Sequence, residues 1–237
     1  MTLQHEIKSQ LAKLLATEDL IVEHKQCETA EFNVATRVLT LPLWDKASGT
    51  VYDMLVGHEV GHALFTPDRN WYTEVQIPPQ FVNIVEDVRI EKLMKRKYAG
   101  LAKSFYHGYE ELNDDDFFNI ADEDLDDLNL ADRVNLHFKI GNFVDIPFST
   151  AEKEIVKVVD SCETFDEVLN ASKVLYDYCT KANQEATEQV SPDSEDGEED
   201  PDFEPQPQSG QNSEDSDEQN DEDEFEDFIK KMCIIFK

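Results

Sequence analysis

The distribution of charge divides the chain into two parts with different folding prospects. From Ala182 to Ile229 there is no Lys or Arg, and Glu185–Asp227 alone holds 20 of the 53 acidic residues. A segment of this composition cannot bury enough apolar surface to offset the entropy lost on ordering. We therefore expect a folded domain over residues 1–182 and a disordered acidic linker over residues 183–228.

The end of the chain and its overall charge limit the partners it can bind. Residues 229–237 form a short apolar segment, which we interpret either as a docking segment or as the stub of a further domain. The net charge of −32 argues against binding to nucleic acids or to membrane surfaces, because both need clustered Lys and Arg.

No segment approaches the roughly 18–20 apolar residues of a membrane span. A missing signal-peptide pattern and four cysteines without a CxxC pair favour a cytoplasmic location with reduced thiols.

Apolar periodicity predicts an α+β fold for the folded part. A small mixed sheet of two or three strands is expected to pack on a helix that begins with a capping box at Thr50–Asp53, and a mainly helical half follows. The expected elements are a helix at 3–15, strands at 20–25, 31–34 and 37–42, helices at 50–65 and 80–97, and further helices between 101 and 181.

The sequence His58-Glu59-Val60-Gly61-His62 matches the HExxH pattern. In a helix, residues four apart lie on the same face, so both imidazoles can reach one metal ion. Glu59 can then take a proton from water on that ion. The flanking segment 54–65 carries no other acidic or basic side chain apart from the two histidines, which is expected of a buried helix around a metal site.

Two imidazoles leave a tetrahedral zinc site one protein ligand short. Phe65 and Asp68 stand where the longer HExxHxxGxxH pattern has Gly and His, which excludes that arrangement. We take Glu86 as the third ligand, because apolar residues flank it and it follows His62 by a loop and a return helix. Asp87, about 100° further round the helix, is the alternative. Two imidazoles and one carboxylate suit Zn²⁺ best.

Two segments resemble a known family. HEVGHALFTP (58–67) and NIVEDVRIEKLM (83–94) are similar to the N-terminal, zincin-like region of proteins related to the T subunit of aerobic cobaltochelatase, which are common in large tailed phages. The similarity covers about residues 20–180 and includes the string at 98–109. It implies a zincin-like fold and a gluzincin-type zinc metallopeptidase with Glu59 as general base. It also implies a peptide or protein substrate, and the host cytoplasm as location if the chain is viral.

Zincin architecture adds two expectations about the substrate. By analogy, the strand that ends at Leu39–Leu41 would bind an extended peptide by strand addition. The oxyanion would rest on the metal ion, helped by a nearby side chain. Candidates for that help are Tyr106, His107 and Tyr109, although aromatic residues at helical spacing are more often part of a core.

The chain departs from that family in two respects. The family's acidic linker leads to a von Willebrand A-type domain with a metal-ion-dependent adhesion motif, for which this chain has no match. The alternative function is therefore a non-catalytic, metal-binding adaptor or accessory subunit for an AAA+ ATPase, in a chelatase-like or remodelling complex. The gluzincin pattern ExxxD is also missing, because Ile90 stands four residues after Glu86. The carboxylate that orients a ligand imidazole must then be Asp53, Asp87 or Glu91, which the sequence does not rank.

Overall fold

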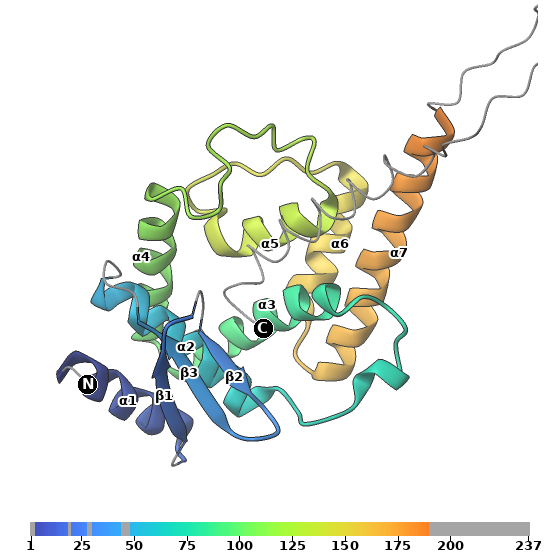
Figure 1. Cartoon of the computed structure of the whole chain (residues 1–237). Helices are drawn as coiled ribbons and strands as arrows, with labels where there is room; N and C mark the ends of the chain where they lie inside the picture. The colour runs from blue at the N-terminus through green and yellow to red at the C-terminus, as the bar shows by residue number, and fades with distance from the viewer. Residues whose placement is uncertain (1–2, 19, 28–29, 44–47, 190–237) are drawn as a thin grey trace, which may run out of the picture.

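The computed structural model describes residues 3–18, 20–27, 30–43 and 48–189. Within these residues it contains seven α-helices, one short 3-10 helix and one three-stranded mixed sheet, so the predicted α+β class is confirmed (Figure 1). The elements are α1 (Leu3–Ala16), β1 (Ile21–Lys25), β2 (Glu31–Asn33), β3 (Val38–Pro42), α2 (Gly49–Phe65), η1 (Trp71–Thr73), α3 (Pro79–Lys97), α4 (Leu101–Asp114), α5 (Leu130–Ile140), α6 (Thr150–Ser161) and α7 (Phe165–Gln189).

The sheet has the order β1-β3-β2, with β1 parallel and β2 antiparallel to β3. β3 is the central strand, and its Leu39 and Leu41 are fully buried. The prediction that a peptide adds to the Leu39–Leu41 strand is therefore wrong, because both edges of β3 already pair with neighbours. Among the described residues, the open edges of this sheet belong to β1 and β2.

The N-cap of the helix that carries HExxH lies two residues before the predicted one. Ser48 is the N-cap, and its hydroxyl accepts hydrogen bonds from the backbone N–H groups of Thr50 and Val51. The predicted capping box at Thr50–Asp53 is wrong. The carboxylate of Asp53 instead accepts a 2.6 Å hydrogen bond from Lys8, and this ion pair links α1 to α2.

Two apolar clusters form the interior. The sheet-side core contains residues of α1, the sheet, α2 and α4, together with Met94 of α3 and Leu136 and Ile140 of α5. The helical core contains residues of α6 and α7 together with the N-terminal halves of α3 and α5. In Figure 1 the sheet, α1, α2 and α4 lie on one side, α6 and α7 lie on the other, and α3 lies between them. α3 thus contributes to both cores.

The predicted boundary between domain and linker needs adjustment. α7 runs to Gln189, so residues 183–189 of the expected linker are helical. The rest of the acidic linker and the apolar segment 229–237 lie outside the described residues. Cys162 and Cys179 are buried thiols. None of the described helices combines the length and the apolar character needed to cross a membrane.

Candidate metal centre

His58 and Glu59 lie inside the molecule, and His62 is half-buried beside them, because α2 is apolar around most of its circumference. His58 and Glu59 are 0% and 1% exposed. Gly61 allows α3 to approach α2 closely, because a Cβ at this position would lie 2.9 Å from Ile90 Cδ1 and 3.1 Å from Met94 Cγ. This close packing brings the acidic side chains of α3 to the imidazoles of α2.

Three atoms from the two helices converge on one point. His58 Nε2 lies 3.2 Å from His62 Nε2. Asp87 Oδ1 lies 3.5 Å from His58 Nε2 and 3.4 Å from His62 Nε2. These three residues form a group that could hold a metal ion. We call His58, His62 and Asp87 the three-residue cluster.

The outer nitrogen of each imidazole has a partner that fixes its proton. His58 Nδ1 lies 3.1 Å from Glu91 Oε1, and an ionised carboxylate only accepts, so Nδ1 carries the hydrogen. The Thr66 hydroxyl donates its own hydrogen to Glu86 Oε1 at 2.5 Å, so it accepts one from His62 Nδ1 at 2.9 Å. In the neutral imidazoles, both Nε2 lone pairs therefore face the centre of the cluster.

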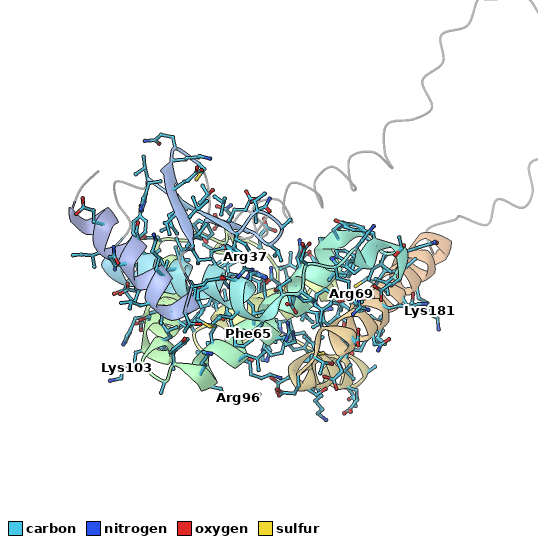
Figure 2. The ribbon with its side chains drawn as sticks, turned by 90° about the horizontal axis from the view of Figure 1, so that it is seen from below. Arg37, Phe65, Arg69, Arg96, Lys103 and Lys181 are labelled. Atoms are coloured by element: carbon cyan, nitrogen blue, oxygen red, sulfur yellow. The ribbon has the colours of Figure 1, made fainter. Side chains whose placement is uncertain are left out.

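The structure places Asp87, and not Glu86, beside the imidazoles. Glu86 accepts hydrogen bonds from Arg89 at 2.8 Å and 2.6 Å, and both side chains are buried. Arg89 also donates to the carbonyl of Phe65, which Figure 2 marks at the end of α2. The preference for Glu86 as third ligand is thus corrected to the alternative, Asp87, because a buried guanidinium already occupies both oxygens of Glu86.

The choice of Asp87 places a second carboxylate at the spacing of the ExxxD pattern, with Asp and Glu exchanged. Counted from Asp87, the residue four positions on is Glu91, and Glu91 accepts the hydrogen bond from His58 Nδ1. Glu91 is itself held by the Tyr109 hydroxyl at 2.5 Å and by Lys95 Nζ at 3.0 Å. Of the three carboxylates considered for orienting an imidazole, Glu91 has this role, whereas Asp53 pairs with Lys8.

The geometry of the cluster fits a small divalent cation. Metal–ligand bonds of about 2.0–2.1 Å in tetrahedral geometry place neighbouring ligand atoms about 3.3–3.4 Å apart. The three separations here are 3.2, 3.4 and 3.5 Å. Asp87 Oδ1 is buried and lacks a hydrogen-bond partner of normal geometry among the described residues. A cation between the two imidazoles would satisfy this buried oxygen.

Glu59 is the second buried carboxylate with an unused oxygen. Its Oε1 has no hydrogen-bond partner within the described part of the chain. Burial raises the pKa of Glu59 to about 7, and the charges of Asp87 and Glu31 act in the same direction. Glu59 is therefore poised to take up and release a proton near neutral pH.

The carboxylates of Asp87 and Glu91 place negative charge beside the imidazole of His58. Burial alone would lower the pKa of His58, but the carboxylates of Asp87 and Glu91 raise it to about 9. Burial would raise the pKa of Asp87, but His58 and Lys139 hold it well below its usual range. Burial likewise acts against the charge of Glu91, yet Lys95 and His58 lower its pKa to about 2. The potential that attracts a proton to His58 also attracts a divalent cation.

Several predicted or overlooked residues can now be placed. Tyr109 lies behind His58 and donates to Glu91, whereas Tyr106 is 43% exposed and packs on Phe143. His107 is on the surface, where it pairs with Glu110. None of these three is in the cluster.

Sequence reasoning missed Thr66, Arg89 and Lys139 as residues around the cluster. The i,i+3 spacing of Glu86 and Arg89 is a signal that could have indicated an ion pair.

The cluster opens to solvent on the side of His62. The His62 side chain is 16% exposed, against 7% for Asp87 and 0% for His58. A cavity of about 360 Å³ lies along α3 and is lined by Lys95, Phe138 and Asp160, among others. Glu91 lines this cavity, but none of the three cluster residues does.

Comparison with protein-family models, with curated proteins and with solved structures finds no significant match for this chain.

Proposed function

We propose that this chain is a zinc-dependent metallopeptidase of zincin-like architecture. The observation that supports it best is the convergence of two imidazole Nε2 atoms and one carboxylate oxygen, with the outer nitrogens tied to Glu91 and Thr66. His58, His62 and Asp87 would hold the ion. Three protein ligands leave one position for water, which is typical of catalytic rather than structural zinc sites.

Glu59 would move the proton in this reaction. When bound, Zn²⁺ supplies Lewis acidity that polarises the scissile carbonyl and makes water acidic enough to ionise near neutral pH. Glu59 accepts the proton of the attacking water and then delivers it to the leaving amine. Burial raises the pKa of Glu59 to about 7 in the metal-free protein, and the positive charge of a bound ion would favour the carboxylate form that accepts the proton.

The open edge of β2 is the proposed place for an extended peptide. β2 contacts α2, and the charge of its Glu31 contributes to the pKa of Glu59. A peptide that pairs with this edge would run beside the HExxH helix. A peptide or protein substrate is thus consistent with the sheet order β1-β3-β2.

The experiment combines metal analysis with cleavage of a broad peptide library. We expect one zinc per purified chain, cleavage that a chelator stops, and recovery when zinc is returned. Glu59→Gln should keep its zinc and lose about 10²–10⁴-fold in kcat/KM, as expected for removal of a general base. The control is Glu154→Gln, the same change in an exposed ion pair on α6. Full activity in Glu59→Gln would exclude the proposed role.

The alternative function has its own outcome in this experiment. A protein that retains zinc but cleaves nothing in the library, with or without chelator, would favour the metal-binding adaptor for an AAA+ ATPase. A protein that binds no zinc would contradict both functions.

A further inference from the structure

Lys139 is a buried cation next to the three-residue cluster. It lies on α5, is 5% exposed, and places its Nζ 3.4 Å from Asp87 Oδ2. The other oxygen of the same carboxylate, Oδ1, faces the two imidazoles. Asp87 is thus shared between a fixed ammonium group on one side and the proposed metal position on the other.

This arrangement limits how Asp87 can bind an ion. A carboxylate binds a metal through one oxygen or through both, and here the ammonium group holds Oδ2. We propose that Lys139 is a positioning residue that restricts Asp87 to a single metal–oxygen bond and so preserves a coordination position for water. This inference rests on the proposed metal centre, and it adds a reason why one coordination position of the ion would remain available for water.

The position of Lys139 disfavours tight metal binding. A buried positive charge near a divalent cation repels it, and the same charge withdraws electron density from the oxygen that binds the ion. If the only role of Lys139 were to stabilise the fold, its loss would loosen Asp87 and weaken metal binding. If it restricts Asp87, its loss should strengthen metal binding and impair the reaction. The sign of the change in zinc affinity separates restriction from a purely structural role, and the coordination number separates restriction from simple repulsion of the ion.

The test is Lys139→Met in the full chain, with Lys139→Arg as the conservative variant. We expect Lys139→Met to bind zinc about 10-fold more tightly, at the lower end of the range for changes to the partners of metal ligands. Peptide cleavage should fall at the same time. The visible absorption of the Co²⁺-loaded variant should change towards that of a site with higher coordination number. Lys139→Arg, which keeps a donor and a charge, should retain the wild-type cobalt spectrum.

The matched control is Lys8→Met, which removes another buried lysine that pairs with a carboxylate of α2 away from the cluster. It should leave zinc affinity and the cobalt spectrum unchanged. Equal or weaker zinc binding in folded Lys139→Met would overturn the inference while leaving the metal centre intact. If Lys139→Met does not fold, X-ray absorption of the zinc-loaded wild type decides, because two oxygens from Asp87 would contradict the inference. A wild type that binds neither zinc nor cobalt would refute the metal centre itself.

Discussion

Glu86 and Asp87 are neighbours in the chain, and the structure gives them different partners. Asp87 faces the imidazoles and Lys139, whereas Glu86 lies between Arg89 and Thr66. Both side chains are buried, so exposure does not distinguish them. The distinction comes from the partner that each carboxylate meets, and substitutions at the two positions should have different effects.

Asp87→Asn should remove metal binding, and it should also destabilise the metal-free protein, because it leaves the buried ammonium group of Lys139 without its charge partner. An amide is a poor zinc ligand, so we expect zinc affinity to fall by more than the roughly 10–100-fold typical of residues that contact a ligand indirectly. Titration with zinc against a competing chromogenic chelator measures this. Near-wild-type affinity in Asp87→Asn would remove it from the ligand set.

Glu86→Gln should lower stability and leave metal binding intact. It leaves the buried guanidinium of Arg89 without its charge partner, so we expect a loss of about 3–5 kcal/mol in the free energy of unfolding. One zinc per folded chain should remain. Urea unfolding and metal analysis of the same preparation test both statements, and loss of zinc from well-folded Glu86→Gln would restore Glu86 as the ligand.

Glu91→Gln tests the hydrogen bond that fixes the proton of His58. The amide introduced by this substitution can donate to His58 Nδ1 and thereby favour the wrong tautomer, so we expect zinc affinity to fall about 10–100-fold. Tyr109→Phe, which removes one of the donors to Glu91, should have a smaller effect in the same direction. A zinc affinity in Glu91→Gln equal to that of the wild type would contradict this assignment.

At the scale of elements, the close approach of α2 and α4 depends on Gly108. Gly100, in the same helix region, serves as a contrast because it has open space around it. A Cβ at Gly108 of α4 would lie 2.9 Å from Met54 Cβ of α2, whereas one at Gly100, the N-cap of the same helix, meets nothing within 4 Å. Met54 Cβ cannot move without its helix. The α2–α4 contact should therefore tolerate no larger residue at position 108.

Gly108→Ala and Gly100→Ala form a matched pair. We expect Gly108→Ala to lower the free energy of unfolding by about 1–3 kcal/mol, as for other overpacked cores, despite the better helix propensity of Ala. Gly100→Ala should change it little. Chemical unfolding of both variants is the measurement, and equal stabilities would show that α2 and α4 are less tightly packed than the structure indicates.

The sequence predicted most elements but only part of the site. Apolar spacing located α2 and α3 within one or two residues, because long buried helices leave a strong pattern. The same burial made Glu86 and Asp87 indistinguishable, since α3 has apolar neighbours on nearly every face. Lys139 could not be predicted, because its contact with Asp87 depends on how α5 packs on α3, which no local pattern encodes.

At the scale of the whole molecule, stability should depend on pH through Asp132, a buried acid far in sequence from the cluster. Burial raises the pKa of Asp132 to about 8, against an ordinary value of about 3.9, and its Oδ1 has no hydrogen-bond partner among the described residues. The folded protein thus holds a proton that the unfolded chain releases. The free energy of unfolding should therefore fall as pH rises from about 4 to about 8.

Asp132→Asn should remove this dependence. At pH 8.5 we expect it to be more stable than the wild type by on the order of a few kcal/mol, with the difference vanishing below about pH 4. Exposed Asp126→Asn is the control. Urea unfolding across this pH range measures the difference, and a constant offset between Asp132→Asn and wild type would show that Asp132 is already ionised in the folded protein.

The position of α3 between the sheet-side core and the helical core has a consequence for cooperativity. An ion held by α2 on one side and α3 on the other would act as a cross-link between two bodies of packed side chains. Amide protons along this seam should then exchange with deuterium much more slowly when zinc is present, while those at the distant end of α7 change little. Binding of the ion would then complete the site and stiffen the molecule at the same time. Removal of the ion would loosen the contact between the sheet-side core and the helical core.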